Sequence, residues 1–152
     1  MEIVLKPLAI VRNQRTEPVD DNWENIISTI ELAENIPTEA FENISDFSHL
    51  EIIYYFDKVK DTDVVFSGRP RGNPNYPTVG IFGQRKKDRP NKIGLATVEL
   101  IAHTGRTIKV KYLDAIEGTP VLDIKPLFKE FQPKTEIRQA SWVSDLMKNY
   151  WK

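Results

Sequence analysis

Residues 113–126, which read LDAIEGTPVLDIKP, say most about how this chain folds. A strand breaks into a loop rich in Gly, Pro and charge and then returns to a strand. Residues 79–95, VGIFGQRKKDRPNKIGL, repeat this format. Prolines hold such loops in shape, and glycines let backbone amides approach a ligand closely. The two stretches are therefore either binding loops carried by a rigid sheet or long hairpin connections, and spacing alone leaves both interpretations open.

Short extended segments surround these two stretches. Apolar and β-branched runs predict strands at 3–11, 50–56, 64–66, 79–82, 95–101 and 107–113, and the last two are joined by a hairpin turn at 102–106. Residues 26–32 fit either a strand or a helix. Residues 68–77 contain three prolines and are expected to form an irregular loop, which in a compact domain is usually functional or mobile.

Helices are expected at only two places. Residues 38–44 follow Pro37 and predict a short helix with Thr38 as its N-cap. Near the C-terminus, one apolar helical stripe is formed by Trp142, Val143, Leu146, Met147 and Tyr150. Its expected role is packing on the sheet or on a partner subunit, although Trp142, Tyr150 and Trp151 could instead stack a base.

These elements predict a mainly β (α+β) fold, a small antiparallel β-barrel-like domain with a short helix and a C-terminal helix. We expect a single domain over residues 1–152, with its core at about 5–128 and a helical extension at about 136–152. No G-x-G-x-x-G motif follows the first strand, so the fold is predicted to be of a non-Rossmann type.

Composition excludes several kinds of chemistry. The chain has no cysteine, which rules out disulfides, zinc–thiolate sites and cysteine nucleophiles. With only two histidines, His49 and His103, no His-rich metal site fits within one chain, and we expect no metal centre. There is no apolar run long enough to span a membrane and no recognisable signal peptide, so a soluble, cytoplasmic protein is expected.

Charge is distributed unevenly along the chain. The formal net charge is -1, but residues 69–92 hold seven basic residues and one acid, a local balance of +6. A cluster of Lys and Arg of this kind is typical of a phosphate-facing or nucleic-acid-facing surface. The alternative is a solvated basic loop without a partner.

The two stretches together resemble the TsaA-like (TrmO) family. The strings that carry the resemblance are Gly80-Ile81-Phe82 with Arg85, Arg89-Pro90-Asn91 with Ile93-Gly94-Leu95, and Asp114 with the run from Glu117 to Pro126. It covers about residues 5–128 and leaves out the C-terminal segment. The resemblance implies a homodimeric β-barrel methyltransferase that binds S-adenosylmethionine near the subunit interface. The implied acceptor is N6-threonylcarbamoyladenosine beside the tRNA anticodon, methylated at its exocyclic nitrogen.

The resemblance also implies roles for individual residues. Contacts to the cofactor are expected from Asp57, Lys58, Arg85, Leu95, Lys111, Tyr112, Leu113 and Asp114. From the basic region 69–92, rather than from the resemblance, contacts to RNA are expected at Arg69, Arg71, Arg89, Asn91 and Lys92. Asp114 is the candidate for holding the ammonium or hydroxyls of the cofactor, and Arg85 and Arg89 for its carboxylate or an RNA phosphate. Asp123 is the candidate catalytic residue, orienting the acceptor amine or accepting its proton; alternatively it pairs with Lys125 or an arginine.

Two positions depart from the family pattern. Lys92 stands where the family commonly has a second proline, and Asp57 stands where it commonly has histidine. An acidic run also replaces a basic element of the N-terminal loop. These departures leave open a non-catalytic module that binds S-adenosylmethionine or RNA, or a methyltransferase with another acceptor.

Overall fold

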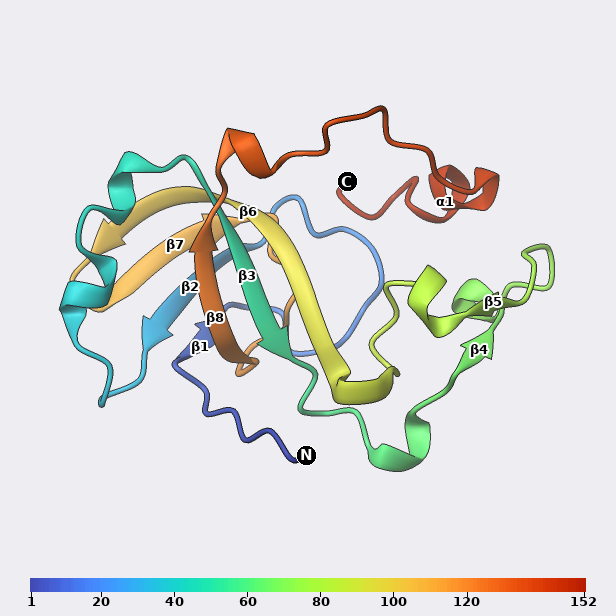
Figure 1. The fold of residues 1–152 in the computed structure, drawn as a ribbon, viewed down its shortest axis with the longest axis horizontal. Helices are drawn as coiled ribbons and strands as arrows, with labels where there is room; N and C mark the ends of the chain where they lie inside the picture. Colours follow the sequence, from blue (N-terminus) through green and yellow to red (C-terminus); the bar gives the residue numbers. More distant parts are fainter.

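The structure is a computed structural model that describes residues 1–152, and its centre is a closed six-stranded barrel. The neighbours around the barrel run β1-β2-β7-β6-β3-β8, all antiparallel (Figure 1). The strands are β1 (Ala9–Arg12), β2 (Ile27–Leu32), β3 (His49–Tyr55), β6 (Ile93–Thr104), β7 (Thr107–Lys111) and β8 (Pro120–Pro126). This confirms the predicted fold class, and it assigns the ambiguous segment 26–32 to a strand.

Alternation along the strands builds the core. In β3, Leu50, Ile52 and Tyr54 are buried while the residues between them are only partly covered. Side chains of a strand point to opposite faces in turn, so each strand sends every second residue into the barrel. The core cluster also takes in Val11, Val98 and other inward-facing apolar residues.

The long strand β6 closes the barrel by changing partners. Its first half, from Ile93 to Glu99, pairs with β3, and the part from Glu99 to Thr104 pairs with β7, with a register shift between Leu100 and Ala102. A bulge of this kind bends a strand and strengthens its twist, which lets one strand serve two sides of the barrel.

A long excursion leaves the barrel between β3 and β6. It contains the two-stranded sheet β4 (Ser67–Gly68) and β5 (Val79–Gly80) and four 3-10 helices. Those helices are η3 (Asp61–Asp63), η4 (Pro70–Gly72), η5 (Ile81–Gly83) and η6 (Pro90–Lys92). In Figure 1 the excursion and the red C-terminal segment lie on the same side of the barrel.

The helices differ most from the prediction. Residues 38–46 form two 3-10 helices, η1 (Thr38–Phe41) and η2 (Ile44–Asp46); Pro37 occupies the N-cap of η1, and Thr38 makes no capping hydrogen bond. The expected C-terminal helix is reduced to α1 (Ser141–Leu146), followed by turns, and a further 3-10 helix, η7 (Lys129–Phe131), precedes it. None of the helices has the length and apolar content needed to cross a membrane.

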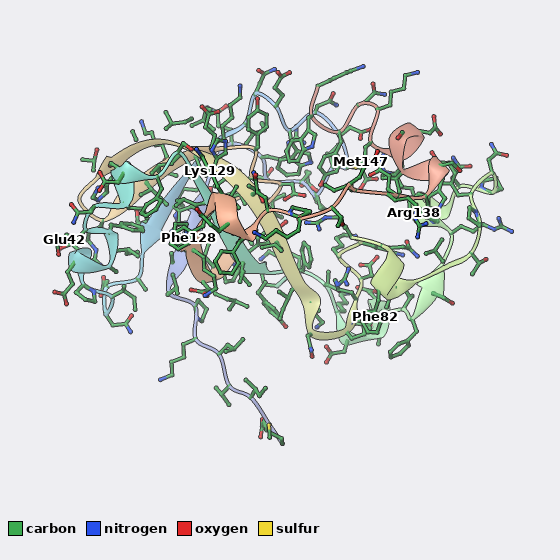
Figure 2. All side chains as sticks on the ribbon, turned by 45° about the horizontal axis from the view of Figure 1, so that its top comes forward. Glu42, Phe82, Phe128, Lys129, Arg138 and Met147 are labelled. Atoms are coloured by element: carbon green, nitrogen blue, oxygen red, sulfur yellow. The ribbon has the colours of Figure 1, made fainter.

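The first predicted strand is also shorter than expected. Only Ala9–Arg12 pairs, while Ile3 and Val4 are 74% and 75% exposed in an arm that leaves the barrel (Figure 2). Likewise, residues 64–66 stay outside any sheet and residues 81–83 form η5. Apolar content alone predicted strands there, but their backbone hydrogen bonds are made within the excursion, where the Val65 amide donates to the Asp88 carbonyl at 3.1 Å and the Ile81 amide to the Phe66 carbonyl at 2.9 Å.

Candidate active site

Asp114 is the centre of a polar cluster at one end of the barrel, where β3 and β7 end and β6 and β8 begin. The Tyr54 hydroxyl donates to Asp114 Oδ1 at 2.7 Å, and the Tyr150 hydroxyl donates to Asp114 Oδ2. Tyr54 reaches the site from the end of β3, inside the barrel, and Tyr150 reaches it from the C-terminal segment. Both oxygens of this carboxylate therefore have a neutral donor.

The two tyrosines keep their protons in this setting. Burial raises the pKa of Tyr54 well above its ordinary value, and the neighbouring Asp114 carboxylate raises it further. The same two causes raise the pKa of Tyr150, while nearby Arg85 opposes the rise in both. A tyrosinate beside a carboxylate would place two negative charges together away from water, so both hydroxyls remain donors at neutral pH.

Gly94 makes room for the Tyr54 ring. A Cβ at Gly94 would lie 2.4 to 2.9 Å from three ring atoms of Tyr54, closer than van der Waals contact permits. Gly94 is paired directly with Tyr54 across β3 and β6. The Ile93-Gly94-Leu95 string is thus part of the Asp114 site through packing.

The structure brings several of the predicted cofactor residues to this end of the barrel. Arg85 donates to the Leu95 carbonyl and lies near both tyrosine hydroxyls. Lys111 lies 5.0 Å from the centre of the Tyr112 ring, and Tyr112 has a left-handed backbone with φ of 68°. The Leu113 side chain is fully buried in the core, so only its backbone is left for a ligand.

Asp57 and Lys58 follow the end of β3 and pair with each other, with Lys58 Nζ at 3.3 Å from Asp57 Oδ2. No hydrogen bond or ion pair joins either of them to Asp114. They share the site's end of the barrel without forming part of the cluster, and their role in binding stays a prediction.

Asp123 lies apart from the Asp114 cluster. It pairs with Ile53, whose neighbours Ile52 and Tyr54 point into the core, so Asp123 faces outward from β8. Its carboxylate lies 2.8 Å from Lys125 Nζ, which matches the structural alternative for this residue. The catalytic role of Asp123 therefore stays a prediction. It would apply to an acceptor that binds outside the barrel.

The basic residues of the excursion have partners within the chain. Arg71 lies 2.9 Å from Asp21, Lys92 pairs with Asp61, and Lys86 and Lys87 both lie within 3.5 Å of Asp88. Arg69 and Arg89 donate to loop carbonyls, those of Pro74 at 3.1 Å and Gln84 at 2.7 Å. Exposed ion pairs are weak and exchangeable, so such partners do not prevent phosphate contact.

The loop around Asn91 and Lys92 has an unusual backbone. Asn91 and Lys92 have φ values of 62° and 50°, in the left-handed region. A proline has φ locked near -65° and is excluded there. The departure at Lys92 therefore means that this loop follows a path that a proline at this position could not adopt.

Tyr54, Gly94 and Tyr150 were not predicted from the sequence as members of the site. A usable signal existed for Tyr54, because a buried tyrosine normally needs a hydrogen-bond partner, but that signal does not say which acid supplies it. Tyr150 carried no such signal, because its helical spacing with Trp142 and Leu146 pointed to packing.

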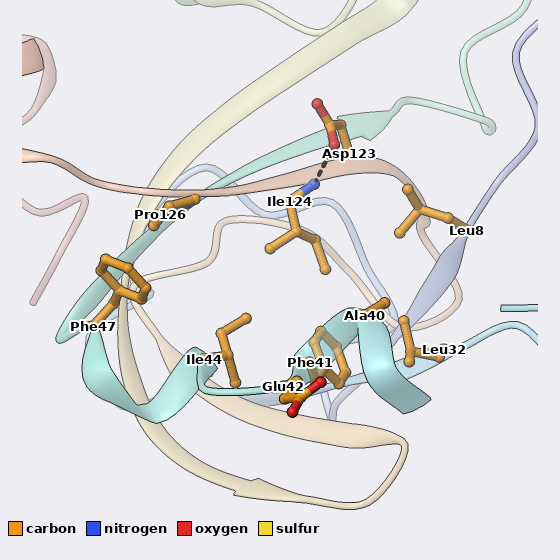
Figure 3. Close-up of a pocket in the computed structure, with 10 residues that line it drawn as sticks. All are labelled: Leu8, Leu32, Ala40, Phe41, Glu42, Ile44, Phe47, Asp123, Ile124 and Pro126. Carbon is orange, nitrogen blue, oxygen red and sulfur yellow. Dashed lines mark hydrogen bonds between the residues drawn. The ribbon is translucent and has the colours of Figure 1, made fainter. Parts of the chain in front are cut away.

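The two main cavities lie away from Asp114. One, of about 320 Å³, is bordered by Leu8, Phe41, Phe47 and Ile124 between β8 and the two 3-10 helices η1 and η2, with Asp123 at its rim (Figure 3). The other borders Ala9, Leu32 and Pro120. In addition, no three His, Asp or Glu side chains are grouped so that they could hold a metal ion.

Comparison with known proteins shows which family the chain resembles. The sequence model described as the tRNA-methyltransferase O N-terminal domain matches residues 11–132. A probable S-adenosyl-L-methionine-binding protein of Methanothermobacter thermautotrophicus is 32% identical over 133 residues, covering 86% of this chain and 93% of the relative. One of Pyrococcus abyssi is 29% identical over 146 residues, covering 93% of this chain and 76% of the relative.

Two longer proteins are also similar to this chain. The human tRNA (adenine(37)-N6)-methyltransferase is 32% identical over 115 residues, which are 76% of this chain and 26% of that protein. The crystal structure of TrmO from Pseudomonas aeruginosa superposes with a TM-score of 0.75 at 23% identity, covering 93% of this chain and 62% of TrmO. At that identity the superposition establishes the fold alone. From the match over residues 11–132, the chain belongs to the family of the tRNA-methyltransferase O N-terminal domain.

Proposed function

We propose that this protein is an S-adenosylmethionine-dependent methyltransferase that modifies the exocyclic nitrogen of an adenine in tRNA. The observation that carries the proposal is the Asp114 carboxylate, held by Tyr54 at the barrel end inside the sequence block shared with the family. Relatives of this chain are described as S-adenosyl-L-methionine-binding proteins and as tRNA (adenine(37)-N6)-methyltransferases.

The side chains around Asp114 suit the polar groups of the proposed cofactor. A carboxylate accepts hydrogen bonds from an ammonium or from ribose hydroxyls, and the Arg85 guanidinium suits a carboxylate. Tyr54 holds Asp114 in one orientation, and Gly94 holds Tyr54. The backbones of Leu95 and of residues 111–113 border the same end of the barrel and could meet the base or sugar.

The chemistry needs little from the protein beyond alignment. S-Adenosylmethionine supplies an electrophilic methyl group when bound. The residues of this chain would have to hold the acceptor nitrogen in line with it and keep water out. Asp123 is our candidate for orienting the acceptor amine or taking its proton; because it faces outward from β8, the acceptor would have to approach the barrel from outside.

The proposed acceptor is N6-threonylcarbamoyladenosine beside the tRNA anticodon. Support comes from the description of the human relative and from the basic excursion between β3 and β6. Arg69, Arg71, Arg89, Asn91 and Lys92 are the residues we assign to RNA. A polyanion would compete with Asp21 for Arg71 and with Asp61 for Lys92.

We also propose that the protein works as a cytoplasmic homodimer. The support is a set of large apolar side chains left exposed outside the barrel, among them Phe66 and Phe82, which are 74% and 83% exposed. Both lie at the β4–β5 pair, and Phe82 is on the outer side of the excursion in Figure 2. Exposed aromatic side chains of this size are typical of surfaces that meet another protein.

A second candidate function is a module that binds S-adenosylmethionine without transferring its methyl group. One observation favours it: Tyr150 already occupies one oxygen of Asp114. Binding without turnover on any tRNA would select this alternative.

Calorimetric titration with S-adenosylmethionine tests the proposal, followed by transfer of labelled methyl groups to tRNA that carries the threonylcarbamoyl modification. Wild-type protein should bind saturably, and Asp114→Asn should bind at least about tenfold more weakly, since a charged hydrogen bond is lost. Asp123→Asn should bind normally but transfer slowly. Wild-type protein that fails to bind, while remaining folded, would remove the proposed function.

A further inference from the structure

The C-terminal segment closes the Asp114 site from outside the barrel. We call residues 141–152 the strap. Tyr150 donates to Asp114 and Trp151 packs edge-on against Tyr112, with 5.6 Å between ring centroids. The strap thus touches two residues that the family resemblance assigns to the cofactor.

Four further contacts tie the strap to loops. The backbone amides of Asn22 and Trp23 donate to the carbonyls of Asn149 at 3.1 Å and Tyr150 at 2.9 Å. The Tyr76 hydroxyl donates to the Asp145 carboxylate, and the Tyr76 and Trp142 rings lie 6.0 Å apart. The strap is therefore held by the loop after β1 and by the excursion rather than by the barrel strands.

The strap is attached without any share in the hydrophobic core. None of its twelve residues is buried, and none belongs to the core cluster. Segments with few buried apolar contacts open locally at a small free-energy cost. The strap can therefore leave its position while the barrel stays folded.

The two tyrosines on Asp114 are not equivalent. Tyr54 is 2% exposed and is wedged against Gly94, so it cannot withdraw without disturbing the barrel. Tyr150 is partly exposed and belongs to the strap. A ligand that needs an Asp114 oxygen can take it from Tyr150 but not from Tyr54.

Asp114 is partly exposed, but both of its carboxylate oxygens are occupied while the strap is in place, one by Tyr54 and one by Tyr150. A ligand that needs one of these oxygens therefore has to displace a tyrosine hydroxyl. The hydroxyl on the strap is the one that can leave without disturbing the barrel.

We propose that the strap is a built-in competitor for the Asp114 site, and that a ligand binds only when Tyr150 releases the carboxylate and the strap moves. This inference rests on the proposed function, because it takes S-adenosylmethionine as the ligand of Asp114. Beyond that function, the strap would regulate access to the site of its own chain. All twelve residues of the strap lie outside the family match.

The test compares full-length wild-type protein with Tyr150→Phe and Tyr76→Phe by calorimetric titration with S-adenosylmethionine. Tyr150→Phe removes the hydroxyl on Asp114, and Tyr76→Phe loosens the strap at Asp145, away from Asp114. We expect affinity to rise about 3- to 30-fold in the first and about 2- to 5-fold in the second. Phe131→Leu, at an exposed side chain outside the strap, is the control and should bind like wild type.

Hydrogen exchange of residues 141–152 gives an independent readout. On addition of S-adenosylmethionine to the wild-type protein, exchange in the strap should become faster because the strap is released. Slower exchange, or weaker or unchanged binding by Tyr150→Phe, would mean that the strap is a wall of the site and would overturn the inference while leaving the proposed function intact. Absence of binding in wild type and all variants would instead remove the proposed function, and the inference with it.

Discussion

At the scale of single residues, Gly94 is the glycine at which a side chain would fit least well. A methyl group at this position would lie 2.4 Å from the buried Tyr54 ring, and the ring has no free space into which to move. We expect Gly94→Ala to lower the free energy of unfolding by about 1–3 kcal/mol, as overpacking of a core does. It should also weaken cofactor binding, because Tyr54 would no longer hold Asp114.

Gly80→Ala is the matched control for this prediction. A Cβ at Gly80 meets nothing within 4 Å, and its φ of -59° suits any residue. Urea denaturation of the two variants checks the prediction. Equal urea midpoints for the two variants would show that the packing of the Tyr54 ring does not require a glycine at position 94.

Lys92 gives a second prediction at this scale. Its φ of 50° excludes proline, and its amide donates to the Arg89 carbonyl at 3.0 Å. Lys92→Pro should therefore destabilise the fold by about 3 kcal/mol. Lys92→Gly, which tolerates positive φ, should cost less than about 1 kcal/mol, so thermal unfolding that ranks the two variants the other way would contradict the prediction.

At the scale of elements, the seam between β1 and β8 depends on Glu117. Only two residue pairs join these strands, Ala9 with Val121 and Ile10 with Pro120. Beyond them, the Glu117 carboxylate accepts from the Asn13 amide at 2.6 Å and from Arg12 at 3.0 Å. The hydrogen bond from Asn13, followed by that from Arg12, lowers the pKa of Glu117.

This lowered pKa gives the seam a pH dependence. The stabilisation by Glu117 is complete above its ordinary pKa of 4.5 and is lost as the pH falls through the lowered folded value. Glu117→Gln should therefore unfold at lower urea than wild type at pH 7, and the difference should shrink below about pH 4. Glu42→Gln, at an exposed glutamate, serves as the control. A difference that stays constant with pH would show that the Glu117 charge does not hold the seam.

At the scale of the whole molecule, charge is unevenly placed. The net charge is -1, yet the excursion carries the basic cluster, so binding to tRNA should depend on that face and on salt. Replacing Lys86 and Lys87 together with glutamate should weaken tRNA affinity. It should also make the slope of log affinity against log salt shallower by roughly 1.5.

Lys109→Glu, on the outer face of β7, is the matched control because it changes charge outside the excursion. Filter binding over a range of salt concentrations measures both effects. Equal loss of affinity in the two variants would mean that tRNA does not approach through the excursion.

The amino-acid sequence by itself determined the barrel. Short β-branched runs separated by Gly and Pro turns favour antiparallel strands, and alternating side chains such as Leu50, Ile52 and Tyr54 require that one face of the sheet be covered. The same reasoning located Asp114 at a strand end. Local pattern is sufficient for these features because strand alternation and turn chemistry act over a few residues, whereas Arg85 was assigned to the same site by the family resemblance.

Only the tertiary structure decided what surrounds Asp114. Tyr54, Gly94 and Tyr150 come from three segments that are 40 and 56 residues apart along the chain, and no local periodicity links them. The same holds for the basic excursion, where Asp21 and Asp61 pair with cations that the sequence alone left free for RNA. Contacts of this kind depend on how the closed barrel brings its loops and its C-terminal strap to one end, which is a property of the whole chain rather than of any stretch of it.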